Sequence, residues 1–172
     1  MPLGGGATTT TTTTTRRARN IALSLVRGAL LGGPAGVAAI AGYPELGPAI
    51  TTNLARVEKR LREAIANSDP LADATSRHLV EAGGKRIRPL LTLLCAHLGD
   101  ASRPAVVQAA VVVELTHLAT LYHDDVMDSA PFRRGAPTAH EVWGNSVAVL
   151  TGDLIFARAS ILVSELGSRA LG

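Results

Sequence analysis

The chain has 172 residues, of which 47% are hydrophobic and only 3% aromatic, a length that allows one domain with a sizeable core and is short for two. Its net charge of +3 comes from the start of the chain: four of the 17 Lys and Arg residues precede the first acid, Glu45, leaving 13 basic against 14 acidic residues. The body is therefore nearly neutral, which gives no argument for a nucleic-acid partner. Ala, Leu and Val dominate, and this balance predicts an all-α fold.

Residues 1–50 differ from the rest, and we expect them to form a low-complexity, disordered extension. They hold an unbroken threonine run, Thr8–Thr15, a basic cluster and a Gly/Ala-rich stretch up to about Gly47. Such a composition buries too little apolar surface to fold. An acid-free start that carries arginines is also typical of a targeting segment, which is the alternative interpretation. Arg27 and the Gly32-Gly33-Pro34 break argue against a membrane span.

We expect the folded domain over residues 51–172, where a helical pattern repeats and no segment has the alternation of a strand. Apolar spacing and the positions of Pro and Gly set the helix ends. The expected helices are 52–67, 69–82, 89–98, 105–128, a short one around Val142 and Trp143, and 146–166. Cys95 lies in the third helix, and we interpret it as a core residue of a reduced, intracellular protein. Thr138 and Glu141 have the spacing of a capping box that opens the short helix.

A basic segment, Gly83-Gly84-Lys85-Arg86-Ile87-Arg88-Pro89, precedes the third helix. It places three cations at a helix start, where the helix dipole disfavours positive side chains and favours a bound anion. Free backbone N–H groups, a Gly pair that lets a ligand approach, and Lys85 three residues before Arg88 indicate a diphosphate site. A solvated basic turn is the alternative.

The long fourth helix ends in His123-Asp124-Asp125-Val126-Met127-Asp128. Asp124 and Asp128 are four residues apart on one helix face, where like charges repel and the dipole adds a further penalty. No Lys or Arg lies one turn back to neutralise them. Because carboxylates so placed suit a hard divalent cation, we predict Mg²⁺ at Asp124 and Asp128. A solvated acidic helix end is the alternative.

Other polar residues accompany the acids. His117 lies two helical turns before Asp124, so it shares the acidic face and is a candidate to hydrogen-bond a bound phosphate, although a lone helical His is usually a core residue. Arg133 and Arg134 follow the acids in a loop, where they either balance charge or clamp phosphates. His123 lies off the acidic face, and we give it no role beyond contact with a metal ligand.

Metal-binding acids, two sets of cations and long apolar helices suit a substrate with a diphosphate head and an apolar tail. The basic segment, Glu114-Leu115-Thr116-His117, the acidic segment and Arg133-Arg134-Gly135 resemble, in order and spacing, the front half of the trans-isoprenyl diphosphate synthases, the polyprenyl synthetase family. The resemblance covers residues 51–172. It implies part of an isoprenoid-synthase-type helical bundle and a prenyltransferase that condenses isopentenyl diphosphate with an allylic diphosphate.

The resemblance also implies roles for individual residues. Asp124 and Asp128 would bind Mg²⁺ on the allylic diphosphate with Asp125 assisting, and Arg133 would contact that diphosphate. Isopentenyl diphosphate would be held by four residues: Lys85, Arg88, His117 and Arg134. In this family, small residues five and eight positions before the first Asp leave the tail channel open. Ala119 and Thr116 stand there, which predicts a medium to long product.

Members of the family carry a second aspartate-rich motif downstream, which this chain lacks. We therefore expect a fragment with weak or no turnover alone. A non-catalytic partner of an intact synthase and an inactive truncated product are the alternatives, and a metal phosphohydrolase built on His123-Asp124 is disfavoured because no upstream metal-binding His has a suitable spacing. By analogy we expect a cytoplasmic homodimer when full length, with peripheral membrane contact through the product.

Overall fold

The computed structural model describes residue 44 and residues 46–170. The predicted extension over residues 1–50, with its targeting alternative, lies almost wholly outside them. The described part is helical apart from one small hairpin, which confirms the predicted all-α class. In chain order the elements are α3 (Gly47–Ile65), α4 (Pro70–Glu81), α5 (Ile87–Ala96), α6 (Pro104–Met127), β1 (Phe132–Arg133), β2 (Ala136–Pro137), α7 (Ala139–Trp143) and α8 (Asn145–Ala170).

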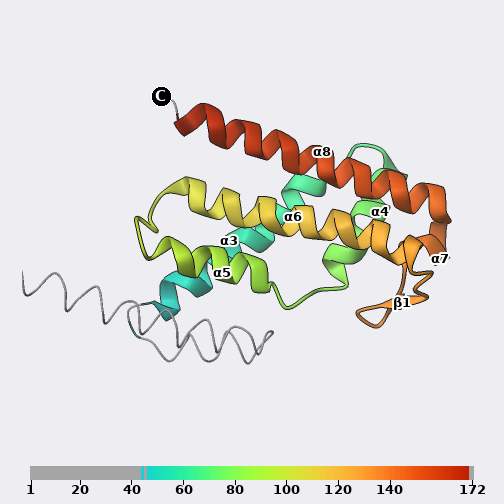
Figure 1. Cartoon of the computed structure of the whole chain (residues 1–172), viewed down its shortest axis with the longest axis horizontal. Helices are drawn as coiled ribbons and strands as arrows, with labels where there is room; N and C mark the ends of the chain where they lie inside the picture. Colours follow the sequence, from blue (N-terminus) through green and yellow to red (C-terminus); the bar gives the residue numbers. More distant parts are fainter. Residues whose placement is uncertain (1–43, 45, 171–172) are drawn as a thin grey trace, which may run out of the picture.

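The central element is α6, the helix that ends in the acidic segment. It packs most extensively against α8 and also contacts α3, α5 and α7. Figure 1 shows α6 and α8 side by side along the molecule, running in opposite directions. The buried residues of α6, from Gln108 to Asp125, share one half of the helix surface, as is typical of a helix that packs against a core on one side. The acidic end of α6 is thereby fixed against the rest of the fold.

Most helix ends lie at the capping residues, prolines and glycines that predicted them. The carboxylate of Asp69 accepts a 2.8 Å hydrogen bond from the Ala72 N–H and caps α4, with Pro70 as the first helical residue. The first helix starts earlier than the expected residue 52, at Gly47. Ile50, only 1% exposed, packs with Leu90 and Leu94 of α5, so tertiary contact extends α3 toward the N-terminus.

Three local expectations are wrong. Cys95 is exposed rather than in the core. Thr138 does precede α7, but its hydroxyl donates to the Ala130 carbonyl at 2.6 Å instead of capping that helix. A hairpin of two antiparallel strands with two residues each, β1–β2, forms where the sequence predicted no strand. Its turn residues Arg134 and Gly135 have φ values of 54° and 81°, and two such residues close a tight hairpin without a long alternating pattern.

Two described helices are long and apolar enough to cross a membrane by length and composition alone: α6 and the Asn145–Gly167 part of α8. A core helix of a soluble protein passes the same test, and half of the α6 window is buried inside the fold. Length and composition therefore assign neither helix to a membrane.

Tyr122 joins the acidic end of α6 to α4. Its buried hydroxyl donates to the Thr75 carbonyl at 2.5 Å and accepts from the Leu79 N–H at 3.2 Å. These two backbone groups are four residues apart in α4, so one hydroxyl contacts two successive turns. Burial raises the pKa of Tyr122 to about 12, against the opposing effect of the hydrogen bond from Leu79.

This pKa predicts a loss of stability in strong alkali. An unfolded tyrosine ionises near pH 10, whereas folded Tyr122 keeps its proton until about pH 12. The contribution is therefore fully present below pH 10 and is lost as the pH rises through 12, by about 2–3 kcal/mol. Urea unfolding at pH 9 and pH 12 should show Tyr122→Phe losing less stability over this interval than the wild type. Equal losses would contradict the prediction.

Candidate functional site

The acidic segment occupies the last turn of α6 and the residue after it, as predicted. Asp128 is the C-cap, and its N–H donates to the Asp124 carbonyl at 2.8 Å. The three carboxylates differ in environment: Asp124 is half-buried, Asp128 is exposed and Asp125 is buried. Asp124 and Asp128 are thus open to solvent at one helix end, while Asp125 points into the fold.

Asp125 is neutralised by Arg133 from the hairpin. The Arg133 Nε donates to Asp125 Oδ1 at 2.5 Å, and the Asp125 side chain is 2% exposed. Its second oxygen, Oδ2, has no hydrogen-bond partner among the described residues. The sequence has no Lys or Arg one helical turn before the acids, and the cation that neutralises Asp125 lies after the helix, on β1.

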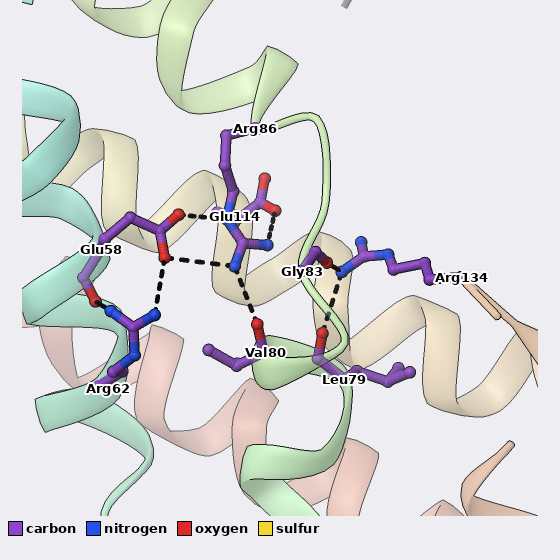
Figure 2. A network of polar contacts seen from close by, with 8 residues as sticks. All are labelled: Glu58, Arg62, Leu79, Val80, Gly83, Arg86, Glu114 and Arg134. Atoms are coloured by element: carbon purple, nitrogen blue, oxygen red, sulfur yellow. Dashed lines mark hydrogen bonds and ion pairs between the residues drawn. The ribbon is translucent and has the colours of Figure 1, made fainter. Parts of the chain in front are cut away.

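The second hairpin arginine points away from the acids. Arg134 Nη1 donates to the Leu79 carbonyl at 3.0 Å and to the Gly83 carbonyl, at the end of α4 and in the loop that follows (Figure 2). Partial burial lowers the pKa of Arg134, and the neighbouring charge of Arg86 lowers it further. The hairpin is therefore tied at one arginine to the acidic helix and at the other to the basic loop.

The basic segment separates into two kinds of cation. Lys85 and Arg88 are exposed. The side chain of Arg86 is 11% exposed and pairs with Glu58 of α3 and Glu114 of α6. The predicted diphosphate site names Lys85 and Arg88 but not Arg86, and the charge of Arg86 is balanced within the fold. Two cations of this segment, Lys85 and Arg88, are left to face a ligand.

His117 is half-buried on α6. Burial first, and then the positive charges of Arg88, Arg134 and Arg133, lower its pKa to about 4, whereas the charge of Asp124 acts in the opposite direction. The ring is therefore neutral at pH 7, and its N–H can donate to an anion without carrying charge.

His123 holds the acidic end of α6 against α8. Its Nε2 lies 3.2 Å from the Val149 carbonyl and 3.3 Å from Asp153 Oδ1, and its ring stacks on Phe156. Gly152 makes this approach possible, because a Cβ there would lie 2.4 Å from Nε2. The sequence predicted no role for His123 beyond contact with a metal ligand. The Gly152-Asp153 pair on α8 is the sequence feature that indicates its packing, because the glycine leaves room for the ring and the acid contacts it.

The chain matches a known protein family. The family model described as polyprenyl synthetase matches residues 69–171, which is more than half of the chain. The chain belongs to the polyprenyl synthetase family.

Similar proteins are polyprenyl diphosphate synthases. The chain is 48% identical over 124 residues to the nonaprenyl diphosphate synthase of Mycobacterium tuberculosis, covering 72% of this chain and 37% of that protein. It is 44% identical over 120 residues to the heptaprenyl diphosphate synthase component 2 of Geobacillus stearothermophilus, with coverages of 69% and 37%. The chain thus spans a little over a third of the length of these relatives.

Solved structures give the same family resemblance. A decaprenyl diphosphate synthase from Rhodobacter capsulatus superimposes with a TM-score of 0.66 and 43% identity, covering 72% of this chain and 38% of that one. A polyprenyl synthase from Caulobacter crescentus, complexed with calcium and isoprenyl diphosphate, gives a TM-score of 0.65 and 40% identity, with coverages of 67% and 35%. The described helices therefore have the fold of the corresponding third of polyprenyl synthetases.

Polyprenyl synthetases generally use a divalent metal ion, and the acids of α6 fit one. Asp124 and Asp128 offer carboxylate oxygens at an accessible helix end, and none of the ion pairs among the described residues involves either. No group of three His, Cys, Asp or Glu side chains within the described part of the chain is placed to hold a metal. Two carboxylates with waters and ligand phosphates satisfy Mg²⁺, whereas a site built only from protein ligands would need more.

Proposed function

We propose that this chain carries one wall of the active site of a Mg²⁺-dependent polyprenyl diphosphate synthase. The supporting observation is that the hairpin joins the two charged segments: Arg133 pairs with Asp125 at the acidic end of α6, and Arg134 donates to the Gly83 carbonyl of the basic segment. Such a cluster, with an accessible carboxylate pair, suits the polyanionic heads of two prenyl diphosphates.

The proposed reaction joins isopentenyl diphosphate to an allylic diphosphate, with loss of pyrophosphate and a proton. Lys85, Arg88 and the neutral His117 bind isopentenyl diphosphate, with Arg134 beside them. Asp124 and Asp128 would hold Mg²⁺, which would supply positive charge to stabilise the departing pyrophosphate. Arg133, held by buried Asp125, presents its remaining N–H groups to the allylic diphosphate. No side-chain nucleophile is required, since the double bond of isopentenyl diphosphate attacks the allylic carbon.

The proposed cellular setting follows from the same chemistry. The substrates are water-soluble diphosphates, so we place the protein in the cytoplasm, with peripheral membrane contact through a long apolar product. We propose a homodimer for the complete synthase. The Geobacillus stearothermophilus relative is named component 2 of its synthase. A heteromer with a second, different subunit is therefore the alternative to a homodimer.

A medium or long product remains our proposal, and the structure sharpens its test. Ala119 is completely buried in the core, so Phe there would overpack the fold, at about 1–3 kcal/mol. Thr116 is half-buried and its hydroxyl donates to the Val112 carbonyl of its own helix, at 2.9 Å. Thr116 is therefore the better position at which to narrow the tail channel.

We expect Thr116→Phe, in a polypeptide that contains the complete synthase domain, to shorten the product by one or more five-carbon units. Chromatography of dephosphorylated products would measure this, with Thr116→Val as the control that keeps the volume and removes the hydroxyl. An unchanged product distribution in Thr116→Phe would contradict the proposal that the face of α6 at Thr116 lines the channel for the prenyl tail.

The proposed activity is tested by reading the coding DNA beyond codon 172 and expressing the longest in-frame product. That polypeptide should incorporate labelled isopentenyl diphosphate into prenyl products only when an allylic diphosphate and Mg²⁺ are both present. Incorporation without Mg²⁺, or none with geranyl, farnesyl and geranylgeranyl diphosphate as primers, would overturn the proposal.

A further inference from the structure

The loop between α4 and α5 carries Lys85 of the proposed diphosphate site, and Arg88 follows in the first turn of α5. The loop has little structure of its own. Its first residues, Gly83 and Gly84, impose no side-chain restraint, and Gly83 has a φ of 80°. The described backbone hydrogen bonds close the loop only at its edges, from Gly83 N–H to the Val80 carbonyl and from Leu90 N–H to the Arg86 carbonyl. Side chains must therefore fix the position of Lys85.

Arg86 supplies that restraint. Its guanidinium donates to both oxygens of Glu58, at 2.5 and 3.4 Å, to Glu114 Oε1 at 3.1 Å and to the Val80 carbonyl at 3.2 Å (Figure 2). These partners belong to α3, α6 and α4, so one side chain ties the loop to three helices. Glu114 is 3% exposed, and a charge pair in so dry a setting holds its geometry more firmly than a surface pair.

The positive charge of Arg86 is balanced by carboxylates of the fold. One guanidinium faces two carboxylates, and Arg62, 3.7 Å from Glu58, brings the group to neutrality. Burial alone would lower the pKa of Arg86, but the hydrogen bonds and charges of Glu58 and Glu114 raise it overall. An anion at the site therefore gains no net attraction from this group, whose influence has to act through the shape of the loop.

Arg134 holds the same loop from the opposite side. It donates to the Leu79 and Gly83 carbonyls. A Cβ on Gly84 would lie 2.9 Å from Arg134 Cζ and 3.0 Å from Arg86 Nη1. The absent side chain of Gly84 thus makes room for two guanidinium groups, rather than for a ligand as the sequence suggested.

We infer that Arg86 is a positioning residue for diphosphate binding: bridged to Glu58, Glu114 and Val80, it holds the glycine loop so that Lys85 and Arg88, on either side of it, present their charges together. This inference rests on the proposed function, since it assumes that Lys85 and Arg88 bind a diphosphate. Arg86 itself touches no substrate. Without it, the glycine loop samples other conformations and the two cations no longer meet the same anion.

The test is calorimetric titration of inorganic pyrophosphate into the 172-residue chain in the presence of Mg²⁺. We expect Arg86→Met to weaken binding about tenfold or more, the usual effect of removing a group that orients a ligand-binding residue. Arg62→Met is the matched control: it removes the same charge and a contact to the same Glu58, but it does not touch the loop. Its affinity should stay within about twofold of the wild type.

Two further variants separate position from charge. Glu114→Gln removes a negative charge, so simple electrostatics predicts tighter pyrophosphate binding, whereas loss of the Arg86 bridge predicts weaker binding. Arg86→Lys restores the charge but not the fork that spans two carboxylates, and it should stay weak. Circular dichroism checks that each variant is folded; should Arg86→Met not fold, Glu114→Gln decides the question.

The outcomes are distinguishable. Absence of pyrophosphate binding by the wild-type chain would contradict the proposed function itself. Wild-type binding with unchanged or tighter binding by Glu114→Gln, or full recovery in Arg86→Lys, would overturn the positioning role and leave the proposed function standing. Weak binding by Arg86→Met, Arg86→Lys and Glu114→Gln, beside a normal Arg62→Met, is the expected result.

Discussion

Replacing Arg133 with methionine is expected to lower the free energy of unfolding by about 3–5 kcal/mol, the usual effect of leaving a buried charge without its partner. Asp125 is 1% exposed. Its Oδ1 is bound by Arg133, and its Oδ2 has no partner among the described residues. Methionine fills a similar volume and gives the carboxylate no hydrogen bond. Urea unfolding followed by circular dichroism at pH 7 measures the change.

The double variant Asp125→Asn with Arg133→Met is the control, because an amide removes the unpaired charge while keeping the shape. It should recover part of the stability that Arg133→Met alone loses. A loss below about 1 kcal/mol in the single variant, as for an ordinary surface pair, would show that the Asp125–Arg133 pair does not stabilise the fold.

The second large effect concerns catalysis. In a polypeptide that contains the complete synthase domain, Asp124→Ala should lower Mg²⁺-dependent prenyl transfer by more than about 100-fold, because losing even an outer partner of a metal ligand costs about 10–100-fold. Asp124 is half-buried at the accessible end of α6, so the substitution removes a ligand with little effect on the core. Incorporation of labelled isopentenyl diphosphate measures the activity.

Glu63→Gln is the matched control for charge. Glu63 is exposed on α3, and its described ion pair is a 3.8 Å contact with exposed Lys59. That variant should keep wild-type activity. Activity retained by Asp124→Ala, or lost equally in Glu63→Gln, would remove Asp124 from the proposed metal site.

Features set by local spacing could be read from the sequence. The acidic turn was predictable because Asp124 and Asp128 stand one helical turn apart before a turn signal, and α6 indeed ends at Met127. The start of α4 was predictable because Asp69-Pro70 is a cap followed by a favoured first residue. His117 could be placed on the acidic face because seven residues make two helical turns.

Features set by contacts between distant segments could not be read in this way. Arg86 stands among cations in the sequence, yet its partners Glu58 and Glu114 lie 28 residues away on either side. Arg133 reaches Asp125 because the chain turns back after α6, where Ser129 has a φ of 50°. Two glycines are the sequence features that indicate some of these contacts, because Gly84 leaves room for Arg86 and Arg134, and Gly152 leaves room for His123.

The central claim is that the acidic end of α6 holds a metal ion on which a prenyl diphosphate binds, and titration of geranyl diphosphate into the 172-residue chain tests it most directly. The account predicts binding that requires Mg²⁺ and weakens at least about tenfold when Asp124 and Asp128 are both replaced by Asn. Binding of equal strength without Mg²⁺, or unchanged in the double variant, would contradict it.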